Sequence, residues 1–373
     1  MMAKTRIGVL FGGRSGEHEV SLQSARSILA NLNPDTFDVI QIAIDHQGKW
    51  YAGAQALIAL ESGDLSQLER VTLLPEPGHN CLYRLNAIRG SAALEKYADL
   101  DVVFPALHGT FGEDGTLQGM FELAGIAYIG AGVLGSAVGM DKGVFKSVML
   151  ANNLPVLPAL VVTRHQVESE IEKVIADAES ISAYPLFTKP ANLGSSVGIT
   201  KCRSRADLYE GLMEAARYDR RIIIEKGLSN AREIEVSVLG NDQPEASTPG
   251  EVVPGEDFYT YSAKYLSDNS KLIIPAALPA EKAAEIQQIA VAAYRAIDCA
   301  GMARVDFLVN AEDLSIFISE VNTIPGFTRI SMYPKLWEAS NLAYPALIER
   351  LVDLALQRKA DRDHTEFEYR RNA

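Results

Sequence analysis

Cysteine is scarce in this 373-residue chain, and long apolar runs are absent. The three cysteines, Cys81, Cys202 and Cys299, are widely spaced and form no C-x-x-C pair and no cluster with histidine. That pattern argues against a disulfide framework and a structural zinc site, and it is typical of a reducing compartment. No stretch approaches the roughly 18 apolar residues that cross a bilayer, and the N-terminal residues lack a secretory cleavage site. We therefore expect a cytoplasmic protein without membrane insertion.

Positive charge is also in short supply, because 35 Lys and Arg against 48 Asp and Glu give a formal charge of −13. Nucleic acids and anionic membranes need a surplus of cations on the protein, so neither is expected as a partner. A small anionic ligand held by a few placed cations remains compatible with this charge. The content of 47% hydrophobic and 22% charged residues is that of an ordinary globular protein. The length suggests two or three domains.

Apolar segments alternate with helical patterns, which predicts an α/β protein with a parallel sheet in its first part. That sheet is expected to contain the strands 7–11, 37–44 and 101–107. The stretch 53–98 is poorly patterned, and we expect it to extend the edge of this first domain. A helix is predicted over 140–152. Two further α/β segments follow, the second of them richer in strands.

The strongest chemical signal is a pair of strands around Asp306 and Glu320. Polar and apolar residues alternate, so Arg304 shares a strand face with Asp306, as Asn322 does with Glu320. A hairpin centred on Asp313 places Asp306 opposite Glu320 and Arg304 opposite Asn322. Opposed carboxylates repel each other, whereas Asp, Glu and Asn oxygens together suit Mg²⁺. The alternative is a solvated strand face whose charge Arg304 neutralises.

A second signal consists of lysines near a glycine loop. Lys142 opens a helix, Lys189 ends a strand before the loop 194–198, and Lys226 follows an apolar strand. Backbone N–H and hydroxyl groups of such a loop can bind phosphate oxygens, although no Walker A sequence occurs. The loop alone is weak evidence, because glycine turns are common. The turn 323–326 that follows the paired strands offers further N–H groups to a developing oxyanion.

A third signal is the glycine turn after the first strand. Phe11 stands where a dinucleotide fingerprint needs glycine, and Asp45 lies too far along the chain, so a nicotinamide or flavin cofactor is disfavoured. Glu17 after this turn suits the ammonium group of a substrate. Its alternative role is a helix N-terminal charge stabilised by the helix dipole.

Two other features are weaker. His108 ends a strand of the parallel sheet, where such sheets place ligands, but a lone histidine is more often structural. The segment 254–269 is rich in Gly, Ser, Asp and Tyr, and its length predicts a mobile lid. The alternative is an ordinary surface loop.

Together these segments resemble the D-alanine-D-alanine ligase family of the ATP-grasp superfamily, in its long-form subgroup. The similarity spans nearly the whole chain in family order, through the segments 12–21, 108–115, 140–142, 189–190, 194–198, 263–265, 301–306 and 320–326. The first and last of these separate the family from other ATP-grasp ligases. The extra length of 53–98 matches the long-form subgroup.

The resemblance implies a three-domain ATP-grasp architecture with ATP between the second and third domains. These are an N-terminal α/β substrate domain over 1–135, a central ATP-grasp subdomain over 136–220, and a C-terminal ATP-grasp subdomain with metal site and lid over 221–373. The implied reaction joins two D-alanines through a D-alanyl phosphate, with release of ADP and phosphate, for peptidoglycan synthesis. The implied cofactors are ATP and two Mg²⁺, with Mn²⁺ as a substitute, and the implied assembly is a homodimer.

Position by position, the resemblance also implies residue roles. The nucleotide would be held by Lys142, Lys189, Ser195, Ser196, Glu225, Lys226, Glu233, Phe258 and Lys264. The metal ligands would be Asp306, Glu320 and Asn322. The catalytic residues would be Glu17, Ser195, Tyr265, Arg304, Gly326 and Ser331, and the D-alanine contacts would be Glu17, His108, Lys264 and Ser331. Tyrosine at position 265 goes with D-alanine, rather than D-lactate, as the second substrate.

The same motifs are compatible with other functions. The nearest is another ATP-grasp carboxylate-amine ligase, or a ligase that makes the D-alanyl-D-lactate ester. A non-catalytic nucleotide-binding regulator is an alternative from another class, and a missing metal ligand would favour it; the Asp, Glu and Asn set is complete.

Overall fold

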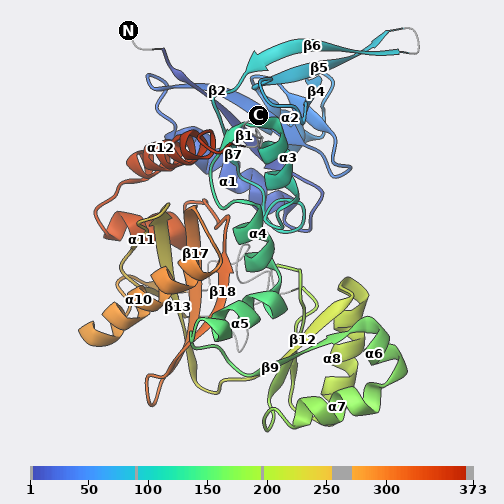
Figure 1. Ribbon diagram of the computed structural model, residues 1–373, viewed down its shortest axis with the longest axis vertical. Coiled ribbons are helices and arrows are strands. Elements are labelled where there is room, and N and C mark those ends of the chain that lie inside the picture. Colours follow the sequence, from blue (N-terminus) through green and yellow to red (C-terminus); the bar gives the residue numbers. More distant parts are fainter. Residues whose placement is uncertain (1–2, 89–90, 195–196, 254–270, 367–373) are drawn as a thin grey trace, which may run out of the picture.

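The computed structural model describes residues 3–88, 91–194, 197–253 and 271–366, whose strands form three sheets (Figure 1). The first sheet has the order β6-β5-β4-β3-β2-β1-β7-β8. Its strands are β1 (Thr5–Gly12), β2 (Phe37–Ile44), β3 (Trp50–Ala52), β4 (Glu69–Leu73), β5 (Cys81–Ile88), β6 (Ser91–Asp99), β7 (Val102–Pro105) and β8 (Ala127–Tyr128).

The parallel part of this sheet is the one that the apolar runs predict. Strand β1 pairs in parallel with β2 and β7, and β7 pairs in parallel with β8. Strands β3 to β6 continue the sheet in antiparallel order, so the stretch 53–98 does extend its edge. The helices of this part are α1 (His18–Asn31), α2 (Ala56–Ser62) and α3 (Thr116–Ala124).

The helix predicted over 140–152 corresponds to α5 (Lys142–Ala151), and a further helix, α4 (Val133–Met140), precedes it. Asp141 separates them, because its extended backbone ends α4 while its carboxylate caps α5 by accepting hydrogen bonds from the N–H groups of Gly143 and Val144. The prediction that Lys142 opens a helix is therefore confirmed, whereas α4 was not predicted. The cap leaves Lys142 as the first residue of α5.

The second sheet is antiparallel, with the order β11-β10-β12-β9. Its strands are β9 (Ala159–Thr163), β10 (Leu186–Pro190), β11 (Thr200–Cys202) and β12 (Arg221–Lys226). Its helices are α6 (Arg164–Ser169), α7 (Ile171–Glu179) and α8 (Arg205–Tyr218). Apolar side chains of α7 and α8 pack on β10 and β12 in one core cluster.

The third sheet has the order β16-β15-β13-β17-β18, with β14 paired to β13. Its strands are β13 (Ala231–Gly240), β14 (Glu245–Ala246), β15 (Gly250–Val253), β16 (Lys271–Ile273), β17 (Gly301–Asn310) and β18 (Ile316–Asn322). Helices α10 (Ala280–Ala296), α11 (Met332–Ala339) and α12 (Tyr344–Arg362) follow in the same part of the chain. Phe145 and Met149 of α5 pack into the core between this sheet and α10.

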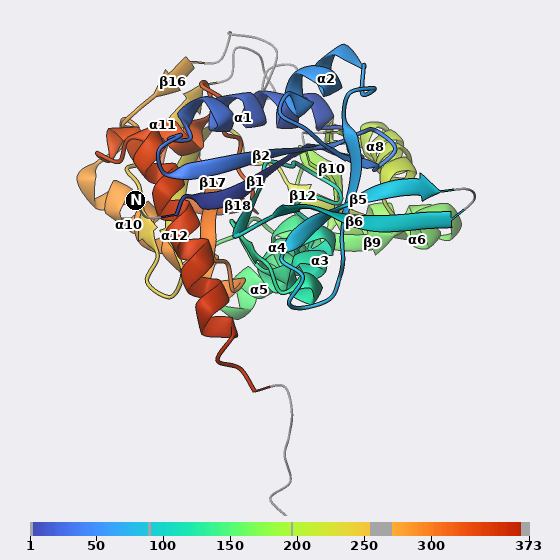
Figure 2. The ribbon, with the colours of Figure 1, turned by 90° about the horizontal axis from the view of Figure 1, so that it is seen from above.

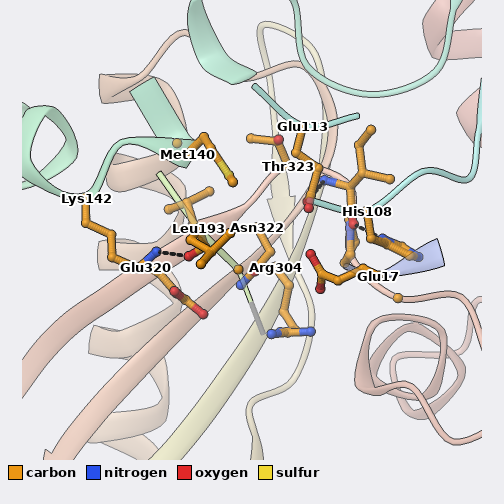
Figure 3. A pocket seen from close by; sticks show the side chains of 16 residues that line it. Glu17, His108, Glu113, Met140, Lys142, Leu193, Arg304, Glu320, Asn322 and Thr323 are labelled. Atoms are coloured by element: carbon orange, nitrogen blue, oxygen red, sulfur yellow. Dashed lines mark hydrogen bonds between the residues drawn. The ribbon is translucent and has the colours of Figure 1, made fainter. Parts of the chain in front are cut away.

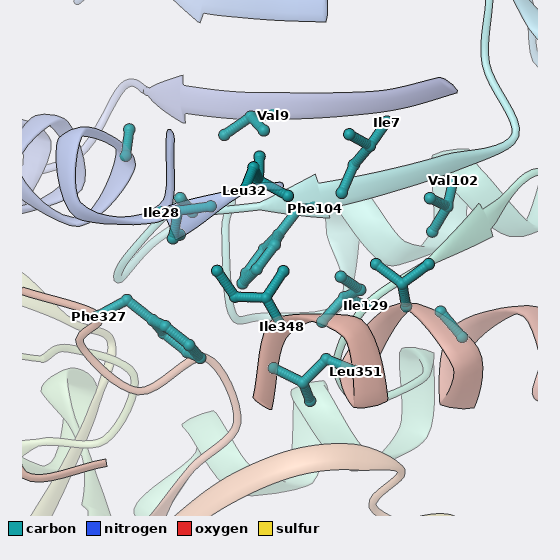
Figure 4. Close-up of a cluster of buried hydrophobic side chains, with 14 of the residues drawn as sticks. Ile7, Val9, Ile28, Leu32, Val102, Phe104, Ile129, Phe327, Ile348 and Leu351 are labelled. Carbon is teal, nitrogen blue, oxygen red and sulfur yellow. The ribbon is translucent and has the colours of Figure 1, made fainter. Parts of the chain in front are cut away.

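Helix α12 joins the third part of the chain to the first sheet (Figure 2). Its buried Ile348 and Leu351 share one core cluster with Ile7 and Phe104 of the first sheet (Figure 4). Phe327, which lies between β18 and α11, enters the same cluster and meets the Phe104 ring edge-on, with ring centroids 5.4 Å apart. This shared core holds the loop after β18 against the strand ends of the first sheet. None of the described helices is long and apolar enough to cross a membrane.

Candidate functional site

A pocket lies where loops from the three parts of the chain meet (Figure 3). It encloses about 60 Å³ and is lined by side chains from the first sheet's loops, from α5, and from strands β17 and β18. Seven of the residues singled out in the sequence line it, namely Glu17, His108, Lys142, Arg304, Glu320, Asn322 and Gly326. Residues more than 300 positions apart in the chain thus share one cavity.

The hairpin of β17 and β18 has the register that the alternation predicts. Asp306 pairs with Glu320, and Arg304 pairs with Asn322. A bulge after Asp306 shifts the rest of the hairpin by one residue, so that Phe307 pairs with Ile318. The bulge ends the regular ladder next to the carboxylates and leaves the predicted face intact.

Arg304 is the electrostatic centre of this face. Its guanidinium donates two hydrogen bonds of 2.6 Å to Asp306 and lies 2.9 Å from Glu235. Asn322 donates through Nδ2 to the same Asp306 carboxylate at 2.9 Å. Arg304 therefore neutralises charge as the alternative interpretation states, but its side chain is only 16% exposed. The face belongs to a cavity wall rather than to a solvated strand.

The oxygen donors of this face fit a hard divalent cation. Asp306 and Glu320 supply carboxylates, and Asn322 keeps its amide oxygen as a ligand because Nδ2 already donates to Asp306. Oxygen ligands of this kind suit Mg²⁺ or Mn²⁺ when phosphate oxygens complete the shell. These three residues are the ones that would hold such ions.

Glu17 is positioned by two glycines. It is 8% exposed, and its backbone N–H donates to Ser15 Oγ, which in turn donates to the carbonyl of His108. A Cβ atom at Gly194 would lie 2.8 Å from Glu17 Oε2, and one at Gly109 would also collide with that atom. The carboxylate therefore occupies space that only glycine at both positions leaves open. In Figure 3 it points into the same space as the Arg304 guanidinium.

His108 connects the first sheet to the loop after β18. Its Nδ1 donates to the carbonyl of Ile324 at 3.0 Å, which makes Nε2 the acceptor for the Ser24 hydroxyl at 2.9 Å. Ser24 Oγ also accepts a hydrogen bond from the N–H of Phe327. Burial lowers the pKa of His108 to about 4, so the ring is neutral near pH 7. The sequence analysis gives His108 two alternative roles, a structural one and a substrate-binding one. In the structure both ring nitrogens hydrogen-bond to groups of the protein.

Glu113 is a site residue that the sequence analysis missed. Its carboxylate accepts hydrogen bonds from the N–H groups of Gly109 at 2.6 Å and Ile324 at 3.2 Å, so it links the same two loops as His108. Desolvation and the nearby charge of Glu17 raise the pKa of Glu113 well above its usual value. An acidic residue within the glycine-rich segment 108–115 was the available signal.

The predicted nucleotide residues form a charged cluster beside the pocket. Glu225 lies 2.5 Å from Lys189 and also pairs with Lys146, whose Nζ donates to the carbonyl of Leu157. Burial opposes charge on Glu225, but the two lysines outweigh it and lower its pKa to about 2. Lys146 was missed by the sequence analysis, although it stands one turn after Lys142 on α5.

The other predicted nucleotide-binding residues, Glu233, Lys142 and Lys226, each have different neighbours. Burial lowers the pKa of Lys189, but Glu225 and, to a smaller extent, Glu320 and Glu233 raise it above its usual value, so the last two carboxylates also lie near that lysine. Lys142 donates to the carbonyl of Leu193 at 2.7 Å. Successive strand residues face opposite ways, so Lys226 lies on the other side of β12 from Glu225.

Ser331 lies beside Gly326, because a Cβ atom on that glycine would be 2.8 Å from Ser331 Oγ. The same hydroxyl accepts a hydrogen bond from the N–H of Thr328 at 3.0 Å. The remaining predicted residues lie outside the described part of the chain: Ser195, Ser196, Phe258, Lys264 and Tyr265, together with the predicted lid 254–269.

We expect Glu225→Gln to destabilise the protein by about 3–5 kcal/mol, because two buried ammonium groups lose their counter-charge. The double variant Glu225→Gln, Lys146→Met should recover part of that loss. Urea unfolding of the three proteins provides the measurement. The folded-state pKa of Glu225 is depressed, so its contribution is present above pH 4.5 and is lost as the pH falls toward 2. Equal unfolding midpoints of wild type and Glu225→Gln at pH 7 would contradict this account.

Comparison with known proteins covers nearly the whole chain. A family model described as the D-ala D-ala ligase N-terminus matches residues 6–131, and one described as the D-ala D-ala ligase C-terminus matches residues 148–353. The D-alanine--D-alanine ligase of Heliobacterium modesticaldum is 50% identical over 96% of both chains. That of Acetivibrio thermocellus is 49% identical over 96% of this chain and 97% of its own.

Solved structures agree with this similarity. The D-alanine-D-alanine ligase of Coxiella burnetii superposes with a TM-score of 0.82 at 36% identity, covering 96% of each chain. The VanG D-Ala:D-Ser ligase of Enterococcus faecalis also gives 0.82, at 34% identity over 95% of this chain and all of its own. They confirm the ATP-grasp architecture that the sequence predicts. The chain belongs to the D-alanine-D-alanine ligase family.

Proposed function

We propose that this protein joins two molecules of D-alanine to D-alanyl-D-alanine, coupled to conversion of ATP to ADP and phosphate. The observation that supports this most directly is the shared pocket, in which an ammonium-binding carboxylate, Glu17, lies with Arg304 and the carboxylate of Glu320. Such a pocket accommodates a zwitterionic amino acid next to a phosphate-binding site. The similarity to ligases of this family points to the same reaction, and peptidoglycan synthesis is its proposed role.

In the first step, a carboxylate oxygen of one D-alanine attacks the γ-phosphorus of ATP, and the bond from that phosphorus to the β–γ bridging oxygen breaks. The D-alanyl phosphate and ADP are the products. Glu17 binds and orients the ammonium group, while Lys142 and Lys189 bind phosphate oxygens near Glu320. Two Mg²⁺ ions, or Mn²⁺ in their place, on Asp306, Glu320 and Asn322 would neutralise phosphate charge during this transfer.

In the second step, the neutral amine of the other D-alanine attacks the acyl carbon, the bond from that carbon to the phosphate oxygen breaks, and the leaving phosphate takes up the proton that the amine loses. The tetrahedral intermediate carries an oxyanion, which Arg304 and the N–H of Gly326 are placed to stabilise at the pocket wall. Ser331 beside Gly326 and Lys264 are proposed to bind the carboxylate of this second D-alanine. Ser195 and Tyr265 complete the proposed hydrogen-bonded set around Glu17.

ATP is proposed to lie between the second and third sheets, at the Lys189–Glu225 cluster. Glu225 is kept ionised by two lysines and can accept a hydrogen bond from the adenine amino group. Lys226, Glu233, Ser196, Phe258 and Lys264 are proposed as further nucleotide contacts. The proposed domains are 1–135, 136–220 and 221–373, and the proposed assembly is a homodimer. The three cysteines are free and buried, which suits a cytoplasmic enzyme.

A second candidate differs only in the amine or alcohol that accepts the D-alanyl group. The structural similarity to a D-Ala:D-Ser ligase favours D-serine as the competing second substrate, and D-lactate is the competing alcohol. Tyrosine at position 265 supports D-alanine over D-lactate. Product analysis with D-alanine alone, and with D-serine or D-lactate added, separates these candidates.

We expect purified protein with ATP and Mg²⁺ to release phosphate only when D-alanine is added, and not with L-alanine. The reason is that Glu17 and Arg304 are proposed to bind both ends of the amino acid, so the methyl group of L-alanine would take the position of the Cα hydrogen of D-alanine. A coupled phosphate assay with mass-spectrometric detection of the dipeptide measures both outcomes. Phosphate release that is independent of D-alanine would refute the proposal.

Gly194→Ala should raise KM for D-alanine, because the new methyl group collides with the Glu17 carboxylate. We expect an increase of about tenfold, corresponding to about 1.4 kcal/mol of lost binding, with unchanged urea stability. The matched control is Gly119→Ala, where an added Cβ meets nothing within 4 Å. Steady-state kinetics of both variants provides the test, and equal KM values for the two would contradict the placement of Glu17.

A further inference from the structure

Two histidines and one glutamate gather outside the pocket, at the carboxyl ends of β1 and β2. His18 and Glu19 begin helix α1, and His46 follows β2 in the tight turn to β3. One ligand atom from each of the three side chains lies within 4.8 Å of the other two. The two loops are themselves tied together, because the N–H of Gly13 donates to the carbonyl of Ile44 at 2.9 Å. The cluster is therefore built on a fixed backbone.

His18 is already oriented as metal-binding histidines are. Its side chain is buried, and Nδ1 donates to the carbonyl of Gly13 at 2.8 Å. That bond fixes the tautomer and leaves the lone pair of Nε2 as the only ring ligand. Metal-bound histidines usually carry such a bond from their second nitrogen to a carbonyl or carboxylate.

The side chains of His46 and Glu19 are exposed, so they have room to change rotamer when an ion binds. The His46 ring stacks on the His18 ring, with centroids 3.8 Å apart and planes 26° from parallel. In nearly parallel rings the lone pairs do not converge, so a shared ion requires the His46 ring to turn about its side-chain bonds. Asp45 does not compete for the ion, because its carboxylate accepts hydrogen bonds from the N–H groups of Gln47 and Lys49.

We propose that His18, Glu19 and His46 bind a transition-metal cation of the Zn²⁺ type, with water in the fourth position. Two imidazoles and one carboxylate are ligands that Zn²⁺ accepts, whereas Mg²⁺ prefers oxygen ligands alone. Glu19 also offsets the unfavourable field of the α1 N-terminus on a bound cation. The site is distinct from the Asp306–Glu320–Asn322 set and does not depend on the ligase reaction.

The proposed metal site lies directly next to Glu17 in the sequence. His18 directly follows Glu17, and the Glu17 carbonyl accepts the backbone hydrogen bond of Ser21 in the first turn of α1. An ion that joins His18 to His46 would add a second connection between this turn and the end of β2, beside the hydrogen bond from Gly13 to Ile44.

The test is Zn²⁺ binding to the full-length, nucleotide-free protein, measured by competition with a chromogenic chelator in the presence of saturating Mg²⁺. Saturating Mg²⁺ competes with Zn²⁺ for the carboxylate-rich face, and the three cysteines do not compete because they are buried. We expect one Zn²⁺ bound by the wild type, and about tenfold or greater weakening in His46→Gln and in Glu19→Gln. Both positions are exposed, so these variants should fold normally.

His165→Gln is the matched control, since His165 is exposed on α6 and lies outside the cluster. It should bind Zn²⁺ as the wild type does. Substitution of Co²⁺ should give the intense visible absorption of a four-coordinate site in the wild type and lose it in His46→Gln. Absence of Zn²⁺ binding by the wild type, or equal affinity in His46→Gln and His165→Gln, would overturn the proposal.

Discussion

The site depends on hydrogen bonds that hold the loop after β18 against the loop after β7. His108 donates to the carbonyl of Ile324, and Glu113 accepts from the N–H of the same residue. Ser24 joins the two connections by bonding both His108 and the N–H of Phe327. Phe327 in turn enters the core that α12 shares with the first sheet. Because of this connection, Glu17 from the first sheet and Arg304 from the third line the same cavity.

The electrostatics of the pocket explain how an acidic protein can accept ATP. The chain carries a formal charge of −13, yet Lys142, Lys189 and Arg304 are concentrated at the site, and metal ions on the carboxylate face would add to them. The buried Glu225 carboxylate is the counter-charge of Lys189 and Lys146, and these two lysines keep it ionised. Net charge therefore indicates which macromolecules the surface avoids, while the local field decides which small anion binds.

Much of this arrangement is predictable from sequence, because it rests on local periodicity. Alternation along two strands predicts the pairing of Asp306 with Glu320, and the structure confirms it. Strands β4 to β6 lack a clear pattern, so only their place at the sheet edge was predicted. Glu113 and Lys146 were missed because their partners, Ile324 and Glu225, are remote in sequence and local pattern does not show such contacts. Helix α4 was missed because two glycines, Gly135 and Gly139, lower the helix propensity of its short segment.

The central claim is that ATP phosphorylates the carboxylate of a D-alanine held by Glu17 and Arg304. Phosphate released from unlabelled ATP during turnover of D-alanine labelled with ¹⁸O in its carboxyl group measures this directly. The account predicts one ¹⁸O atom in each phosphate, because the attacking carboxylate oxygen leaves with the phosphoryl group when the peptide bond forms. Phosphate without ¹⁸O, formed together with the dipeptide, would contradict it.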